Sequence, residues 1–192
     1  MAAALAVVAR DGWRDTNLRS IAMEAGCGLS ALLPVLPSKH ALFDLIARRA
    51  DDAMLAEDLG PDAQESTRDQ LFELLMRRFD ALEPHRSQIA ILLRQSAQDP
   101  AALLCGGLAA GRSMGLALEA AGLQSSGLKG MLQRKGLGAV ALYALRAWLG
   151  DETPDRSITM AALDKALRRA EALVCIVTGR PGTPPPPMAA NA

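Results

Sequence analysis

The stretch GWRDTNLRSIAMEAGCGLSALLPVLPSKHAL, residues 12–42, predicts two short helices joined by a tight turn and followed by the start of a third. Apolar side chains recur at helical spacing over residues 18–25 and give the first helix one apolar face. Asp15 or Thr16 can cap this helix, because a short side-chain oxygen accepts hydrogen bonds from its free N–H groups. Gly26 follows, where a chain leaving a helix often needs a positive φ. The pattern is typical of a helix-turn-helix.

The second helix of this motif has an apolar stripe and an internal proline. The stripe consists of Leu29, Leu32, Leu33 and Leu36. Pro34 lies several residues inside the helix, where it removes a backbone hydrogen bond and crowds the preceding turn. Pro37 ends the helix, and Ser38 can cap the next one. We therefore predict that the second helix is short or kinked.

This stretch resembles the DNA-binding head of the TetR family of transcriptional regulators. The positions that match the family pattern in register and without a gap are Thr16, Ile21, Ala22, Ala25, Gly26, Leu32, Ser38, Lys39 and Leu42. Three unrelated amphipathic helices remain the alternative. The resemblance implies an all-α, TetR-like fold with a three-helix head at residues 1–48. It also implies a ligand-binding and dimerisation body at residues 49–179 and a homodimer.

The resemblance implies DNA binding, but the second helix departs from the family pattern. Leu29, Ala31, Leu33 and Pro34 stand where the family carries polar side chains, and none can donate a bidentate bond to a base. If the chain binds DNA, most contacts must come from Arg14, Thr16, Arg19, Ser30, Ser38 and Lys39. Such contacts go mainly to phosphate, so we expect binding that is weak and little dependent on sequence.

The composition favours helices and gives no general attraction to nucleic acid. Half of the 192 residues are apolar and only 3% are aromatic, which favours helices over strands. The formal net charge is +0, so the whole molecule exerts no strong pull on a polyanion. Cys27, Cys105 and Cys175 are far apart, as is typical of reduced thiols in a cytoplasmic protein. We expect no membrane-spanning segment, because no uninterrupted apolar run is long enough.

The rest of the chain predicts a helical body and a tail. Helices are expected over residues 67–83, 84–98, 100–121, 128–149 and 158–177. Asp99 is expected to cap the third of these, with Pro100 at its first position. The resemblance implies that the last two of these form the dimer interface, and we expect Leu163 and Leu167 to lie in it. The proline-rich residues 180–192 lack a core face and are expected to be disordered.

An apolar cavity is expected in the body, because regulators with this head bind effectors there. Its predicted lining residues are Leu75, Phe79, Leu92, Leu108, Met114, Leu118 and Tyr143. Tyr143 could supply the polar group that orients an apolar small molecule. The small residues between Gly106 and Gly115 can serve close helix packing or leave room for a ligand.

A second resemblance concerns the body alone. ALEPHR at residues 81–86 and AWLGDETPDRSITMAALDKALRRAE at residues 147–171 are similar to segments of the TetR-fold lipid-binding accessory proteins of ubiquinone biosynthesis. That group has lost DNA reading and holds an isoprenoid or lipid. The chain lacks the aromatic-rich segment that the group usually carries before its penultimate helix.

Neither enzyme chemistry nor a metal or other cofactor is predicted. His40 and His85 lie in separate segments without an obvious nucleophile or carboxylate partner, and no metal-binding pattern is present. The leading interpretation is a ligand-responsive transcriptional regulator that acts as a homodimer. The alternative is a lipid-binding accessory protein that uses the same fold without binding DNA.

Overall fold

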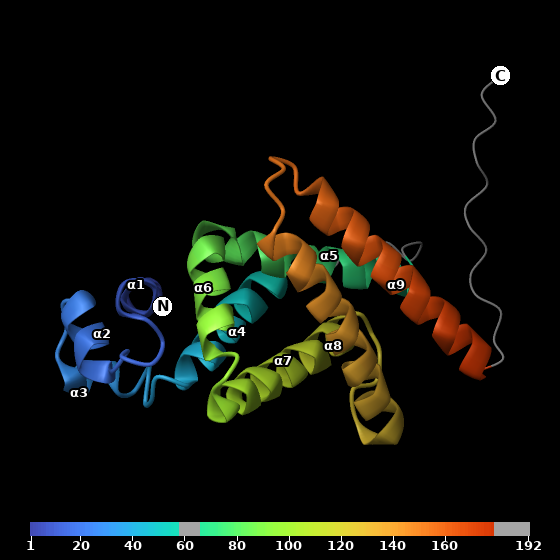
Figure 1. Ribbon diagram of the computed structural model, residues 1–192. Coiled ribbons are helices and arrows are strands. Elements are labelled where there is room, and N and C mark those ends of the chain that lie inside the picture. The colour runs from blue at the N-terminus through green and yellow to red at the C-terminus, as the bar shows by residue number, and fades with distance from the viewer. Residues whose placement is uncertain (58–65, 179–192) are drawn as a thin grey trace.

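The computed structural model describes residues 1–57 and 66–178, with only the helical backbone described for residues 174–178. These residues form helices without any strand (Figure 1). The helices are α1 (Ala2–Asp11), α2 (Leu18–Glu24), α3 (Leu29–Leu32), α4 (Ala41–Met54), α5 (Thr67–Leu82), the 3-10 turn η1 (Glu83–His85), α6 (Arg86–Ser96), α7 (Pro100–Ala120), α8 (Gly127–Leu149) and α9 (Ser157–Thr178). The all-α prediction is therefore confirmed. The predicted tail at 180–192 lies outside the described residues.

The head at the blue end of Figure 1 consists of α1, α2, α3 and the start of α4. Helix α2 is capped by Asn17, whose Oδ1 accepts from Ser20 N at 3.0 Å. The prediction that Asp15 or Thr16 caps it is wrong, because Thr16 is buried and its hydroxyl donates to Gly12 O at 2.7 Å. Gly26 has φ +63°, so the predicted left-handed residue after the helix is confirmed.

Helix α3 is only four residues long, which confirms the prediction of a short second helix. It ends where Pro34 lacks the N–H that would bond back to Ser30 O in a continuing helix. The predicted apolar stripe is only half correct. Leu36 is buried and Leu32 is partly buried, but Leu29 and Leu33, which are one turn apart on the same side of α3, are exposed.

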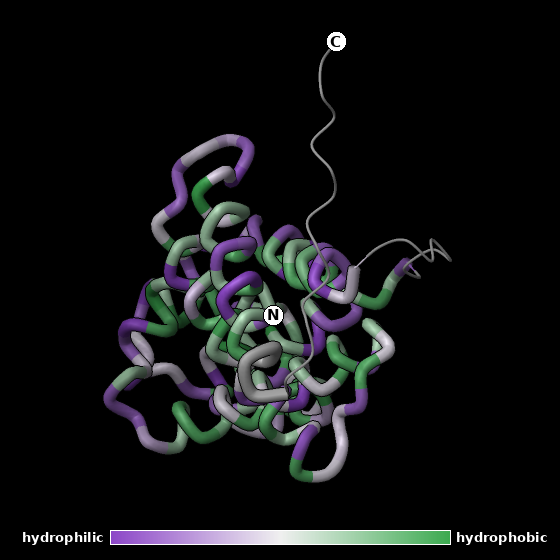
Figure 2. The backbone as a smooth tube through the Cα atoms, turned by 90° about the vertical axis from the view of Figure 1, so that its right-hand side faces the viewer, coloured by the Kyte–Doolittle hydropathy of each residue, from purple (hydrophilic) through white to green (hydrophobic). Residues whose placement is uncertain are grey.

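The body is a layered helical bundle reached from the head through α4. Helix α4 packs against α5 and α7, α8 packs against α7 and α9, and α9 also contacts α5 (Figure 1). Apolar and polar positions alternate along most helices in Figure 2, as amphipathic helices around one core require. Helix α5 matches the predicted helix and buries Leu71, Leu74, Leu75, Met76, Phe79 and Leu82.

The packing of α9 corrects the predicted dimer residues. Leu163 and Leu167 are buried inside one protomer, where α9 lies against α5 and α8. They are therefore core residues, and their helical spacing in the sequence gave no means to separate a core face from an interface face.

Helix α7 is long and mostly apolar, but a large part of it is exposed. By length and apolar composition alone it is long enough to cross a bilayer, although Arg112 interrupts its apolar run and a core helix meets the same criterion. Only 39% of its most apolar window is buried, although the helix lies against α4, α5 and α8.

The connection between α8 and α9 is built around the buried carboxylate of Asp151. Its Oδ2 accepts from Thr159 N at 2.7 Å and from Thr159 Oγ1 at 2.6 Å, and its Oδ1 accepts from Thr153 N at 3.0 Å. Burial by itself raises the pKa of Asp151, but these hydrogen bonds outweigh it and hold the pKa well below the usual range. The ionised carboxylate thus fixes the start of α9.

Replacing Asp151 with Ala should lower the melting temperature by roughly 3–8 °C at neutral pH, because buried donors lose their acceptor. Because the folded pKa is depressed, this stabilisation is present above about pH 4 and is lost as pH falls toward the folded pKa. Thermal unfolding can be followed by circular dichroism at several pH values. The difference in melting temperature between wild type and variant should become smaller as the pH falls. The exposed neighbour Glu152→Ala is the control and should change little; an equal effect there would contradict the assignment.

Candidate nucleic-acid interface and its junction with the body

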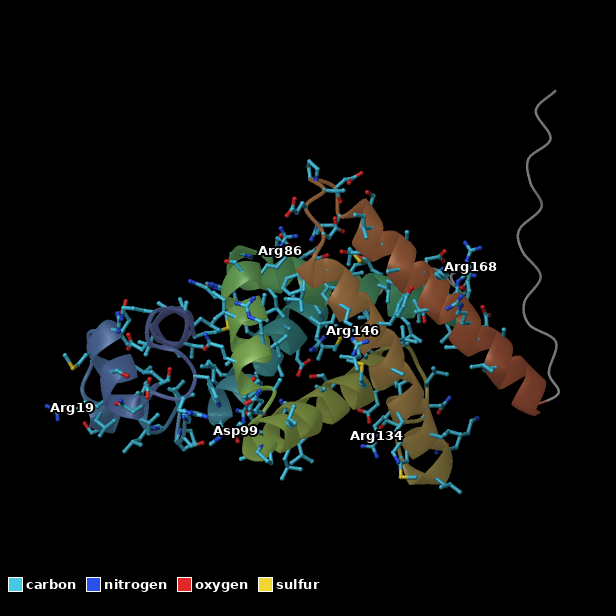
Figure 3. The ribbon with its side chains drawn as sticks, viewed as in Figure 1. Arg19, Arg86, Asp99, Arg134, Arg146 and Arg168 are labelled. Carbon is cyan, nitrogen blue, oxygen red and sulfur yellow. The ribbon has the colours of Figure 1, made fainter. Side chains whose placement is uncertain are left out.

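Four of the six predicted DNA-contacting residues are on the surface of the head. Arg14, Arg19, Ser30 and Ser38 are all exposed. Arg19 lies on α2 at the end of the head remote from the body and points outward (Figure 3). Ser38 Oγ accepts from Ala41 N at 3.3 Å, but the N-cap of α4 is His40, so the prediction that Ser38 caps this helix is wrong. These four side chains can still reach phosphate groups.

The other two predicted residues act inside the protein. Thr16 is buried and bonded to Gly12 O, as described above. Lys39 Nζ donates to Trp13 O at 3.0 Å and to Arg14 O at 3.2 Å, and it lies 4.9 Å from the centre of the Trp13 ring. The expectation of direct DNA contacts is therefore corrected for both residues in this conformation, because each side chain stabilises the chain between α1 and α2.

The surface around α3 is apolar rather than charged. Met23, Leu29, Leu33 and Val35 are all exposed, and Met23 is 74% exposed. These side chains can contact the methyl groups of bases but cannot donate or accept hydrogen bonds. The head therefore has the arrangement of a helix-turn-helix in which α3 offers few polar side chains for direct reading, Ser30 among them.

A polar cluster joins the head to the body. Trp13 N donates to Gln95 Oε1 at 2.7 Å, and Trp13 Nε1 donates to Asp99 Oδ2 at 2.9 Å. His40 Nε2 lies 3.0 Å from the same Asp99 oxygen. Asp99 Oδ1 accepts from the N–H groups of Ala101 and Ala102, as the sequence predicted for the cap of α7. We call Trp13, His40, Gln95 and Asp99 the junction.

The junction places one carboxylate at the meeting point of three segments. Hydrogen bonds from Trp13 and then His40 hold the pKa of Asp99 well below its usual range. The Trp13 ring also packs edge-on against His40 and Phe43. Sequence reasoning identified Asp99 only as a cap, because its contacts with residues more than fifty positions away follow from the tertiary structure alone.

The predicted ligand-binding residues do not form a single group. Leu75, Phe79, Leu92, Met114 and Leu118 are buried members of the core. Leu108 is 67% exposed and Tyr143 is 45% exposed, so their assignment to the same internal wall is wrong. Both occupy helix faces turned away from the core, a distinction that their apolar character could not reveal.

Charged and polar groups meet between α4, α5 and α7. Asp51 on α4 is buried and pairs with Arg78 on α5, and its Oδ2 accepts from Ser113 Oγ on α7 at 2.9 Å. Burial lowers the pKa of the Arg78 guanidinium, whereas Asp51 opposes this effect. A hollow of about 390 Å³ lies nearby at the surface, lined by Ala53, Ala56, Glu57, Glu73, Arg77, Asp80 and Ala81. Its lining is largely charged.

The glycines of α7 differ in how closely other helices approach them. A Cβ on Gly106 would lie 3.5 Å from the Phe43 ring, and one on Gly115 would lie 3.3 Å from Arg134 Cδ. A Cβ on Gly107 or Gly111 would meet no atom of another element within 4 Å. Close packing therefore accounts for Gly115, whereas a Cβ on Gly106 would make an ordinary van der Waals contact and the other two positions have no structural explanation.

No protein-family model and no curated protein matches the sequence. The structure is similar to a TetR transcriptional regulator from Nitrosomonas europaea ATCC 19718, with a TM-score of 0.67, 21% identity and coverage of 88% of this chain and 94% of that chain. It is also similar to one from Rhodococcus sp. RHA1, with a TM-score of 0.60, 16% identity and coverage of 88% and 91%. The chain has the TetR fold. Because both similarities extend over head and body, the TetR fold here includes the helix-turn-helix as well as the helical bundle.

Among residues 1–57 and 66–178, no group of three His, Cys, Asp or Glu side chains is placed to hold a metal ion. His40 belongs to the junction, and His85 Nδ1 lies 3.1 Å from Gln88 Oε1 on the next helical turn. Each histidine therefore has a structural role that its contacts explain.

Replacing Asp99 with Ala should loosen the head, because Trp13 Nε1 and the first N–H groups of α7 lose their acceptor. Hydrogen exchange measured by mass spectrometry should become faster over residues 12–17 and at the start of α7. Asp99→Asn keeps one carbonyl oxygen and should have a smaller effect. Unchanged exchange at residues 12–17 in the Ala variant would contradict a role of Asp99 in holding the head.

Proposed function

We propose that the chain is a TetR-like transcriptional regulator whose head binds DNA mainly through the phosphate backbone. The observation that carries this proposal is the pair Arg14 and Arg19, both exposed on the helix-turn-helix together with Ser30 and Ser38. These side chains can neutralise or hydrogen-bond phosphates, whereas the exposed part of α3 is apolar. DNA affinity should therefore be modest, strongly dependent on salt and little dependent on sequence.

Regulation would act through the junction. Helices α6 and α7 meet at Asp99, and Asp99 holds Trp13 at the start of the head. An apolar effector that shifts α6 or α7 would move this carboxylate and so bias the orientation of the head between two populations. The buried residues Leu75, Phe79, Leu92, Met114 and Leu118 would have to separate to admit the effector.

A second candidate is the lipid-binding accessory protein that lacks DNA reading. Exposed Met23, Leu29, Leu33 and Val35 favour it, because four apolar side chains cover the surface that a DNA reader would present to the major groove. In this case the head would bind an apolar partner, and the body would hold an isoprenoid or another lipid.

DNA binding separates the two candidates and can be measured by fluorescence anisotropy over a series of salt concentrations. Arg19→Ala should weaken binding to all duplexes about equally and reduce the salt slope by about one. Arg169→Ala, an exposed arginine on α9, is the matched control and should bind as wild type. Replacing Leu33 and Pro34 with polar residues should raise affinity if the remaining head is competent.

An absence of DNA binding even at low salt would contradict the proposal that the chain is a transcriptional regulator. Native mass spectrometry of the purified protein then tests the alternative, since a co-purified lipid would support it. Tight and sequence-selective binding by the unmodified protein would instead contradict the proposal that phosphate contacts dominate.

We also propose that the protein is a homodimer formed through α8 rather than through the leucines of α9 predicted from the sequence. Leu132, Gly136, Ala139 and Tyr143 recur at helical spacing along α8, and all four are exposed. A Cβ on Gly136 would meet no atom within 4 Å, so a second helix could approach this part of the backbone closely. An isologous contact along this stripe would cover Tyr143 and Leu132 of both protomers.

Leu132→Glu should convert this dimer into a folded monomer, because it introduces unpaired charge into an apolar contact. Light scattering at micromolar concentration measures the mass, and circular dichroism checks the fold. Leu163→Glu should instead lower the melting temperature, since Leu163 is fully buried within the protomer. A monomeric wild type, or a Leu132→Glu variant that remains dimeric, would show that α8 does not provide this interface.

A further inference from the structure

The first half of α7 presents an uncharged apolar face to solvent. Residues 100–111 contain no charged side chain. Leu103, Leu104 and Leu108 are 59%, 63% and 67% exposed. A cluster of exposed leucines on one helix half is unusual for a surface that contacts only water.

The position of this face relative to α4 and α8 can be derived from the helical period. On the α4 side of α7, Gly106 faces Phe43 and Ser113 donates to Asp51. At 100° per residue, Leu104 and Leu108 lie on the side opposite these contacts. Gly115 lies on that same opposite side, and there Arg134 of α8 covers it. Helix α8 therefore covers the second half of this face, and the first half is exposed.

The stretch of sequence that contains the apolar face carries more cations than acids, although Arg86 pairs with Glu83 and Arg112 pairs with Asp44 on α4. Between Arg86 and Leu149 the only two acids are Asp99 and Glu119, and Asp99 is bonded to Trp13 and His40. The same stretch contains seven cations, namely Arg86, Arg94, Arg112, Lys129, Arg134, Lys135 and Arg146. Seven cations and two acids give this stretch a formal net charge of +5, which reflects its few acids, since 7 of the 21 Lys and Arg residues lie in a third of the chain.

The cations and the apolar side chains approach each other where α7 and α8 meet. Arg134 lies in the angle between these two helices (Figure 3). Gly115, which it covers, is about 10 Å along the α7 axis from Leu108. The first turns of α8 add the exposed side chains of Leu128, Lys129 and Met131.

We propose that the exposed face of α7, together with the first turns of α8, docks on an anionic membrane surface. Exposed leucines can enter the boundary between headgroups and acyl chains, while adjacent Lys and Arg side chains attract anionic lipids. A second copy of the chain already has a proposed contact along the stripe Leu132, Gly136, Ala139 and Tyr143 of α8, so the exposed leucines of α7 are left for a different partner. This docking does not depend on DNA binding by the head.

Co-sedimentation with vesicles tests this proposal. We expect the full chain to bind phosphatidylcholine vesicles that contain about a third phosphatidylglycerol, and to bind pure phosphatidylcholine vesicles much less. Replacing Leu104 and Leu108 together with Gln should weaken binding about tenfold or more. Lys129→Gln should weaken binding to the anionic vesicles about fivefold. Leu55→Gln is the control, because Leu55 is an exposed leucine at the end of α4 beside acidic residues.

Three results would overturn the proposal. The first is no sedimentation of wild type with either vesicle, and the second is equal sedimentation of the Leu55 variant and the Leu104 and Leu108 variant. The third is a change of that double variant from dimer to monomer in light scattering without altered vesicle binding, which would assign the face to a second copy. Circular dichroism of each variant shows that the fold is intact, since all three leucines are exposed.

Discussion

The arrangement of the head depends on the carboxylate of Asp99. This group starts α7 by accepting from two backbone N–H groups, and it also fixes the indole of Trp13 and the ring of His40. Its negative charge is stabilised by these donors, which keeps the pKa of Asp99 low. Because one carboxylate serves the body through Oδ1 and the head through Oδ2, a displacement at the start of α7 cannot leave Trp13 unaffected. The head and the body are thus coupled through the hydrogen bonds of Asp99.

The head also shows how a scaffold can persist while its contact surface changes. Asn17, Gly26 and Leu36 maintain the turn and its packing, and none of them needs to contact DNA. Pro34 shortens α3, and the leucines on either side of it are apolar. A short apolar helix can still be placed against a surface, but it supplies few of the polar groups on which direct readout depends.

The body buries a pair of charged residues and exposes several apolar ones, which the pattern of apolar residues in the sequence does not indicate. The Asp51–Arg78 pair occupies the region between α4, α5 and α7, where burial without the partner would be costly for either charge. Helices α7 and α8, in contrast, carry apolar residues on faces that remain exposed. Helix α7 is apolar enough in composition to cross a bilayer, and it also exposes Leu103, Leu104 and Leu108.

Local chemistry determined much of the secondary structure from the sequence alone. The left-handed Gly26, the break at Pro34, the Asp99 cap and the apolar face of α5 all depend on neighbours within one or two helical turns. The tertiary structure decided which apolar faces are buried, and it placed Leu163 in the core but Leu108 and Tyr143 on the surface. It also turned Thr16 and Lys39 inward and joined Trp13 to Asp99. Helical periodicity identifies a face but not its partner, because the partner is set by contacts between residues far apart in the chain.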